Sequence, residues 1–183
     1  MQEIIVAANE AGQRLDKMLA KYLNEAPKSF LYKMLRKKNI VLNGKKATGN
    51  EKLAVGDSVK LFLADETIAK FSNIHAVHTN VTLDIIYEDE NVLLINKPVG
   101  MLSQKAAADD ESLVEHIISY MLETRQLTEE ELRKFRPSVC NRLDRNTSGL
   151  VAAGKSLAGL QEMGTLFKNR SLRKYYRCLV AGE

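Results

Sequence analysis

The chain has 183 residues, of which 45% are hydrophobic and 27% are charged, and this length and composition suit one or two globular domains with packed cores. Its two cysteines, Cys140 and Cys178, include no Cys-x-x-Cys pair, which argues against a disulfide framework and a thiolate zinc site. No apolar run approaches the roughly 20 residues of a membrane span and the acidic start does not resemble a signal peptide, so we expect a cytoplasmic protein with no membrane partner.

The first part of the chain contains the patterns of two short helices. After a strand candidate at residues 4–7, apolar residues recur at helical spacing. This stripe consists of Leu15, Met18, Leu19, Tyr22 and Leu23. Pro27 interrupts it, and Ser29 is the predicted N-cap of a second helix. The apolar face of the second helix consists of Leu31, Met34 and Leu35.

The segment after the second helix is typical of a small antiparallel sheet. Asn43-Gly44, between residues 40–42 and 45–46, is a dipeptide that favours a tight hairpin turn. Gly56-Asp57 then leads into a run with period-2 alternation over residues 59–63. The sequence therefore predicts a helix-helix-hairpin unit.

Cations follow one another along the second helix and the hairpin, with no acidic residue among them. They are Lys28, Lys33, Arg36, Lys37, Lys38, Lys45 and Lys46. Such a patch can neutralise several RNA phosphates and release counterions, and the net charge of +4 agrees with a polyanionic partner. The alternative is a solvated helix face, but the helix-helix-hairpin context favours RNA binding.

The order of these elements, with the runs Val41-Leu42-Asn43-Gly44-Lys45 and Val55-Gly56-Asp57-Ser58-Val59, resembles the S4 RNA-binding domain. The resemblance covers about residues 13–63. It implies that residues 1–65 form an RNA-binding domain. It also implies that Arg14, at the opening of the first helix, contacts RNA and takes no part in catalysis.

Residues 66–82 are the predicted linker. Within them, His75 and His78 have a spacing that can hold a metal ion. No third ligand lies close in the sequence, so we interpret them as connector histidines and expect no metal site.

The remainder, residues 83–183, predicts an α+β domain with a mixed, mainly antiparallel sheet. Strands are expected at residues 83–87, 92–95 and 151–153. The predicted helix caps are a capping box at Ser112 and Glu115, a second box at Thr128 and Glu131, and a single N-cap at Ser156. The elements do not form a β-α-β series, and no glycine-rich phosphate loop is present.

The most informative run is Asn141-Arg142-Leu143-Asp144-Arg145-Asn146-Thr147-Ser148-Gly149. It places the carboxylate of Asp144 between two guanidinium groups and then turns through small residues into an apolar strand. Flanking cations keep a partly buried carboxylate ionised, which suits a charged catalytic centre. The alternative is a surface ion pair between Asp144 and an arginine at a strand end.

This run resembles the motif His-Arg-Leu-Asp-x-x-Thr-Ser-Gly of the RluA/RluD family of RNA pseudouridine synthases. Asn96-Lys97-Pro98-Val99-Gly100 is similar to a second element of that family. We assign Lys97 and Pro98 no direct role, because such a pair also ends ordinary strands. The stretch from Lys174 to Gly182 is similar to a third pattern, Lys-x-Tyr-x-Ala-x-Val-x-Gly, with cysteine at the alanine position.

The resemblance implies an enzyme that isomerises uridine to pseudouridine in structured RNA, with large-subunit ribosomal RNA favoured and transfer RNA as a lesser alternative. It implies that Asp144 is the catalytic carboxylate, that Arg142 lies near the vacated base stack, and that Tyr176 stacks on the uracil. Tyr176 could instead be a core aromatic of a strand. Arg173 and Lys174 are expected to hold the RNA backbone. Because the reaction involves no redox change, no cofactor is expected.

The chain departs from the family pattern at several places. Asn141 stands where the motif has histidine. Gln104 stands where the family often has a histidine after its Lys-Pro-x-Gly element. The resemblance also implies a further element, bearing an arginine that pairs with the catalytic carboxylate, beyond Glu183. We therefore expect the 183-residue chain to bind RNA with little or no turnover. A monomer is the default expectation. The alternative function is a non-catalytic RNA-binding protein that uses only the basic N-terminal domain.

Overall fold

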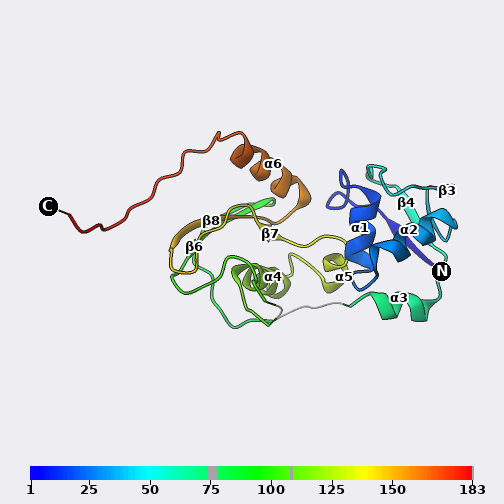
Figure 1. Cartoon of the computed structure of the whole chain (residues 1–183), viewed down its shortest axis with the longest axis horizontal. Coiled ribbons are helices and arrows are strands. Elements are labelled where there is room, and N and C mark those ends of the chain that lie inside the picture. The colour runs from blue at the N-terminus through cyan, green and yellow to red at the C-terminus, as the bar shows by residue number, and fades with distance from the viewer. Residues whose placement is uncertain (74–77, 108, 183) are drawn as a thin grey trace.

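Two four-stranded antiparallel sheets, each packed against helices, make up the computed structural model of the chain (Figure 1). It describes residues 1–73, 78–107 and 109–182. Within these ranges the strands are β1 (Gln2–Ile5), β2 (Ile40–Leu42), β3 (Lys45–Lys46), β4 (Ser58–Leu61), β5 (Ile85–Glu88), β6 (Val92–Lys97), β7 (Ser138–Val139) and β8 (Gly149–Gly154). The helices are α1 (Leu15–Tyr22), α2 (Lys28–Arg36), α3 (Asp65–Phe71), α4 (Leu113–Glu123), α5 (Glu129–Leu132) and α6 (Leu157–Lys168).

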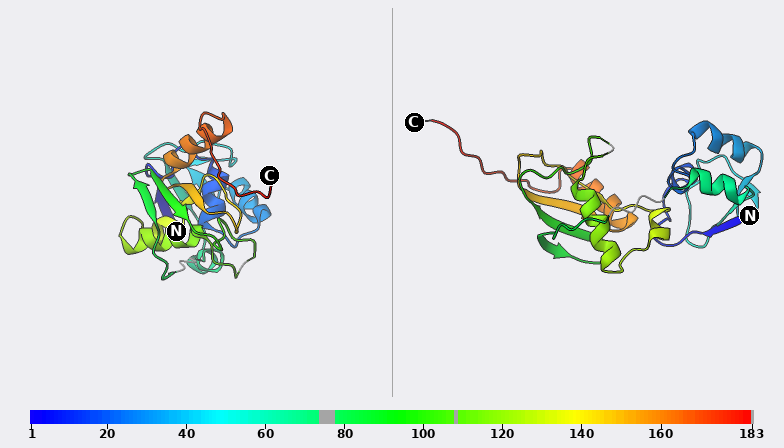
Figure 2. Two further views of the ribbon diagram at one scale, coloured as in Figure 1. Left: turned by 90° about the vertical axis from the view of Figure 1, so that its left-hand side faces the viewer. Right: turned by 90° about the horizontal axis from the view of Figure 1, so that it is seen from below.

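The strand orders are β1-β4-β2-β3 in the first sheet and β5-β6-β8-β7 in the second. Every pair of neighbouring strands is antiparallel, so the predicted α+β class with mainly antiparallel pairing is confirmed. The two sheets lie toward opposite ends of the molecule, as Figure 2 shows. None of the helices in the described ranges has the length and apolar character needed to cross a bilayer.

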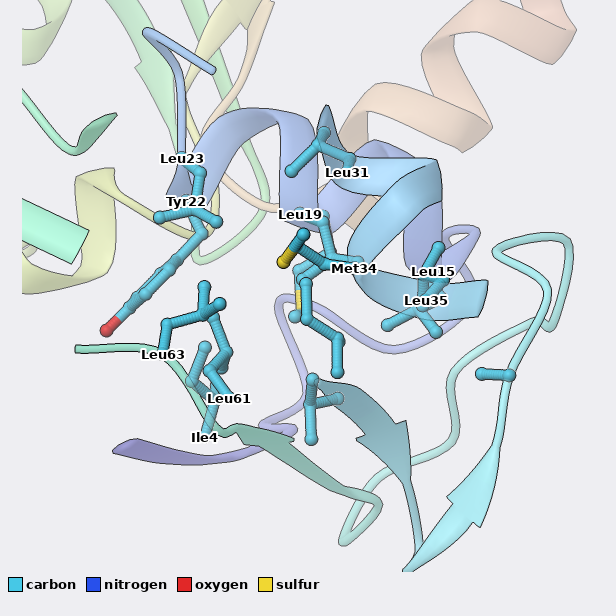
Figure 3. Packing of buried hydrophobic residues seen from close by; sticks show 14 of the residues in the cluster. Ile4, Leu15, Leu19, Tyr22, Leu23, Leu31, Met34, Leu35, Leu61 and Leu63 are labelled. Atoms are coloured by element: carbon cyan, nitrogen blue, oxygen red, sulfur yellow. The ribbon is translucent and has the colours of Figure 1, made fainter. Parts of the chain in front are cut away.

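The helical stripe predicted for α1 forms the centre of the first core. All five of its residues are buried, and so are the three apolar residues that share a face of α2. Figure 3 shows Tyr22 extending from α1 toward the strands that carry Ile4 and Leu61, which belong to the same core. The 3.6-residue period of the sequence therefore located this core correctly.

The second helix begins two residues earlier than the sequence predicts. Pro27 is its N-cap residue, and no side chain caps the first turn, so the expected cap at Ser29 is wrong. Proline has φ near the helical value, and Lys28 and Ser29 are exposed, so water can satisfy their N–H groups without a capping side chain. At the other end, Lys38 adopts φ 59°, and the Asn39 N–H donates to the Met34 carbonyl at 2.9 Å, which completes a Schellman motif.

β2 and β3 pair across Asn43-Gly44, where both residues have positive φ, 50° and 71°. That combination is the type I′ turn that the dipeptide favours. In β4, Val59 and Leu61 are buried while Ser58 and Lys60 are partly exposed, which is the alternation expected of a strand with one face on a core.

Residues 65–71 form α3, in the segment where the sequence predicts a linker. Ile68 is buried in the first core, and the ring of Phe71 lies 4.8 Å from that of Phe30. The helix is short and buries a single apolar residue, so its periodicity was too weak to detect. His75 lies outside the described residues, and His78 is exposed.

The second sheet lies between two helices. Side chains of its central strand alternate between the two faces, so each face presents apolar residues that a helix can cover. Leu93 and Ile95 of β6 belong to the core that α4 covers. The intervening Leu94 faces the other side, where it lines a cavity together with Met163 and Phe167 of α6. Figure 1 shows α4 and α6 on opposite sides of this sheet.

Two of the three predicted caps in this part are confirmed. Thr128 and Glu131 form the reciprocal capping box, and the Ser156 hydroxyl accepts from the Gly159 N–H at 3.0 Å. Ser112 is the N-cap of α4 by position, but its hydroxyl donates to the Glu115 carboxylate at 2.6 Å instead of accepting from the backbone. The predicted box at Ser112 is therefore wrong in its hydrogen bonding.

The chain between the two sheets is anchored on both sides. Asn73 and Asn24 exchange two hydrogen bonds, of 2.9 and 2.8 Å, which attach this segment to the end of α1. Thr79 is buried against α4: its N–H donates to the Ser119 hydroxyl at 2.9 Å, and its hydroxyl lies 2.9 Å from Nδ1 of His116.

The buried imidazole of His116 predicts a loss of stability in acid. Burial lowers the pKa of His116 below 6.5, although Glu111 and Glu115 oppose the shift. The unfolded chain therefore takes up a proton first, and the free energy of unfolding falls as the pH drops through 6.5 toward the lower folded pKa. Urea denaturation from about pH 7.5 to about pH 5 should show a steeper loss for the wild type than for His116→Asn. Parallel pH profiles would contradict this expectation.

Candidate active site

The pairing of β6 with β8 brings together two motifs that lie far apart in the sequence. Lys97 pairs with Gly149, and Asn96 pairs with Leu150, so the Asn96–Gly100 element runs beside the end of the 141–149 run. Gly149 has φ 132°, a conformation that residues with a side chain rarely adopt, and it is the point where the run enters the strand.

A loop that follows β6 braces the backbone around Asp144. The Ser103 hydroxyl donates to the Leu143 carbonyl at 2.7 Å and accepts from the Leu143 N–H at 3.1 Å. Arg145, two residues after Leu143, is bonded to the same loop. Its carbonyl accepts from the Gly100 N–H at 2.8 Å, and its Nε donates to the Gly100 carbonyl at 3.1 Å. Asp144 is thus held by hydrogen bonds on either side of it.

Lys97 supports this loop from the interior, which is a structural role and not a direct part in catalysis. Its side chain is fully buried, and its ammonium group donates to the carbonyls of Pro98 and Met101 at 2.9 and 2.8 Å. Burial lowers the pKa of Lys97, and the negative charge of Asp144 acts in the opposite direction. A lysine that ends an otherwise apolar strand was the signal in the sequence for this arrangement.

Removal of the Ser103 hydroxyl should loosen the loop that carries Asp144. In Ser103→Ala, the buried N–H of Leu143 loses its partner, so the free energy of unfolding should fall by about 1–3 kcal/mol. Ser103→Thr keeps the hydroxyl and serves as the matched control. Amide hydrogen exchange at Leu143 should accelerate in the alanine variant alone; equal exchange rates in both variants would contradict the brace.

A cavity of about 610 Å³ lies between this loop, α6 and the C-terminal segment. Its lining includes Leu143 and Thr147 from the motif and Arg173, Lys174 and Tyr176 from the segment. Tyr176 is 67% exposed, so the alternative of a core aromatic does not apply in this structure. The structure therefore brings part of the 141–149 run and part of the Lys174–Gly182 stretch to one cavity, and the Asn96–Gly100 element does not line it.

Asp144 and Arg142 do not line this cavity; both are exposed on the loop that supplies its wall. Across the described residues, Asp144 forms no ion pair with either flanking arginine and no hydrogen bond with Tyr176 through its side chain. The alternative of a surface Arg–Asp ion pair is thus not what the structure shows, and the carboxylate is open to solvent.

The residue at the family's histidine position has a structural role here. The side chain of Asn141 donates to the Leu150 carbonyl at 3.2 Å and accepts from the Ala152 N–H at 2.8 Å, so it holds β8 in place. Cys140 beside it is half-buried, and burial raises the pKa of its thiol. Cys178, in the C-terminal segment, is exposed.

The seven cations of the predicted basic patch are all exposed on α2, its C-terminal end and the hairpin. Arg14 differs from them, because its guanidinium is bound to Asp16 at 2.8 Å and also donates to Asn50. Figure 1 places α2 and β3 at the opposite end of the molecule from the C-terminal segment with Arg173 and Lys174. The predicted RNA contacts therefore form two separate groups.

Three comparisons place the chain among known proteins. The profile of the RNA pseudouridylate synthase family matches residues 91–183. The chain is 30% identical to ribosomal large subunit pseudouridine synthase C of Vibrio vulnificus, over 100% of the chain and 56% of the relative. It is 29% identical to the protein of that name from Escherichia coli K12, over 98% of the chain and 54% of the relative. Human RNA pseudouridylate synthase domain containing 1 has a TM-score of 0.35 at 20% identity, covering 49% of this chain and 29% of its own; that score is too low to establish a shared fold.

Proposed function

Because the chain belongs to the RNA pseudouridylate synthase family, we propose that the full-length protein isomerises uridine to pseudouridine in RNA. The family match carries this proposal. The matched residues 91–183 include both the loop that carries Asp144 and the C-terminal segment, and these two parts line one cavity. The chain spans about half the length of the curated relatives it matches. Their name, ribosomal large subunit pseudouridine synthase C, makes large-subunit ribosomal RNA the favoured substrate.

In the proposed reaction, the bond between C1′ and N1 breaks, the uracil turns, and a bond forms between C1′ and C5. The proton on C5 leaves and N1 gains one, so the product is an isomer of the substrate. The exposed carboxylate of Asp144 acts as nucleophile or as electrostatic partner of the sugar cation. The target base must leave its stack first, with Arg142 near the vacated position and Tyr176 stacking on the uracil.

The first sheet and its helices supply the proposed RNA-binding part. We assign residues 1–65 to an S4-like domain, residues 66–82 to the connection and residues 83–183 to the catalytic domain. The separate cores of the two sheets support two units, and the packing of Ile68 and Phe71 on the first core puts α3 with the first unit. The basic patch supports RNA binding, since none of its seven cations forms an ion pair within the described part of the chain. Arg14 is the weakest of the predicted contacts, because Asp16 already neutralises it.

The proposed activity can be tested directly. The full-length gene product is incubated with unmodified large-subunit ribosomal RNA, the RNA is digested, and pseudouridine is quantified by nucleoside chromatography. Conversion at one position is the expected result. RNA binding without any conversion would contradict the enzyme and support the non-catalytic alternative.

The basic patch predicts a charge-dependent RNA affinity. Replacing Lys33, Arg36 and Lys37 by Gln should weaken binding by about tenfold or more at moderate salt and reduce the slope of log affinity against log salt by about 2 to 3. A matched triple variant changes the same net charge elsewhere: Lys70, Arg125 and Lys134, each replaced by Gln. Filter binding at several salt concentrations measures both effects, and equal losses in the two variants would rule out a defined RNA surface.

A further inference from the structure

A small cavity lies at the junction between α1 and the segment that follows α5. Its volume is about 190 Å³. The polar residues that line it are Lys21, Asn24, Asn73, Arg133 and Arg136, and the lining includes no carboxylate among the described residues. Three cations therefore converge on a site that has no role in the chemistry proposed above.

The positive charge of Lys21 lies at this site without a nearby carboxylate among the described residues. Its ammonium group donates to the Gln13 side chain at 3.0 Å and lies 5.8 Å from the centre of the Phe135 ring. Burial lowers the pKa of Lys21, and in the described part of the chain no carboxylate lies within ion-pair distance of it. An ammonium group has three donors, and among the described residues the bond to Gln13 uses one of them.

Arg133 is fixed in place but not fully bonded. Its guanidinium stacks 4.2 Å from the centre of the Tyr22 ring, and its terminal nitrogens donate to Ser72 and Glu130. The Nε–H is buried and has no hydrogen-bond partner among the described residues. A buried donor without an acceptor is costly, so this group is suited to receive an acceptor that the described residues do not supply.

We propose that this cavity binds a phosphate group, either of free phosphate or of an RNA phosphodiester. The oxygens of a phosphate accept from several donors at once, here from the Lys21 ammonium group and the unbonded Nε–H of Arg133, and charge-assisted bonds to guanidinium groups are strong. The ligand would touch α1 on one side and the residues after α5 on the other. Occupancy would therefore link the part of the chain around the first sheet to the part around the second.

The test is a titration with inorganic phosphate at constant ionic strength, followed by NMR of the side-chain amides of Gln13 and Asn73. Saturable shifts are expected for the wild type. Lys21→Gln should weaken phosphate binding by about tenfold or more, because it removes a charge-assisted donor. Arg136→Gln, at the exposed mouth, should weaken it as well. Lys17→Gln, one turn away on α1 and outside the lining, is the matched control and should bind phosphate like the wild type.

Non-saturable shifts in the wild type, or equal affinities of the Lys21→Gln and Lys17→Gln variants, would overturn the proposal. A short RNA with hydroxyl ends separates the two sources of phosphate. Competitive displacement of inorganic phosphate by this RNA identifies the ligand as a backbone phosphodiester, and retention of phosphate at saturating RNA identifies it as free phosphate. None of these measurements depends on pseudouridine formation, so they stand apart from the test of the enzyme.

Discussion

Replacing Asp144 by Asn in the full-length protein is expected to reduce pseudouridine formation by about 10³-fold or more. The amide has nearly the same shape as the carboxylate but carries no charge, so it can neither attack as a nucleophile nor stabilise a sugar cation. RNA affinity should stay within about twofold, because the phosphate contacts come from cations elsewhere. Single-turnover nucleoside analysis measures the rate, and filter binding measures the affinity.

Asp65→Asn is the matched control for this experiment. Asp65 is an exposed carboxylate at the start of α3, and its only described ion pair is a 3.8 Å contact with the N-terminal amine. The control should keep full activity. An Asp144→Asn variant that converts uridine as fast as the control would remove the basis for the proposed catalytic centre.

The largest expected loss of stability comes from a single methyl group at Gly159. A Cβ there would lie 2.1 Å from the Asn91 carbonyl oxygen, which is backbone and belongs to the turn before β6. The same turn accepts hydrogen bonds from the Lys155 N–H at 2.8 Å and from Ser156 at 2.6 Å, so it cannot move away freely. Gly159→Ala should lower the free energy of unfolding by about 2–3 kcal/mol, measured by urea denaturation.

Gly164 provides the comparison within the same helix. A Cβ at Gly164 meets no atom within 4 Å. Alanine is the better helix former, so Gly164→Ala should leave stability unchanged or raise it by about 0.5–1 kcal/mol. If both alanine variants lost the same stability, the close contact between α6 and the turn before β6 would not be the cause.

The parts of the fold that were predictable from the sequence rest on local patterns. The spacing of apolar residues from Leu15 to Leu23 specifies a helix with one buried face, and the structure contains it. The Asn43-Gly44 dipeptide specifies a turn with positive φ, and the structure contains that as well. Errors arose where two local solutions compete. Pro27 replaced Ser29 as the N-cap because either residue can begin a helix.

The support of the candidate site was not predictable, because it depends on contacts between distant residues. Ser103 and Leu143 are 40 positions apart and meet only when β6 and β8 pair. Nothing in the neighbourhood of Ser103 marks it as a partner of the motif. The structural role of Lys97 was not predictable for a related reason: its two carbonyl contacts exist only once the following loop has folded.

The anchors at Asn73 and Thr79 limit how far the two halves of the molecule can separate. Six peptide steps reach at most about 20 Å when fully extended. If the first half binds an RNA strand, the second half is confined to a small volume around the binding site. Its local concentration near that strand is correspondingly high. Inserting a flexible stretch between the anchors would enlarge that volume and slow capture of the target base without altering either half.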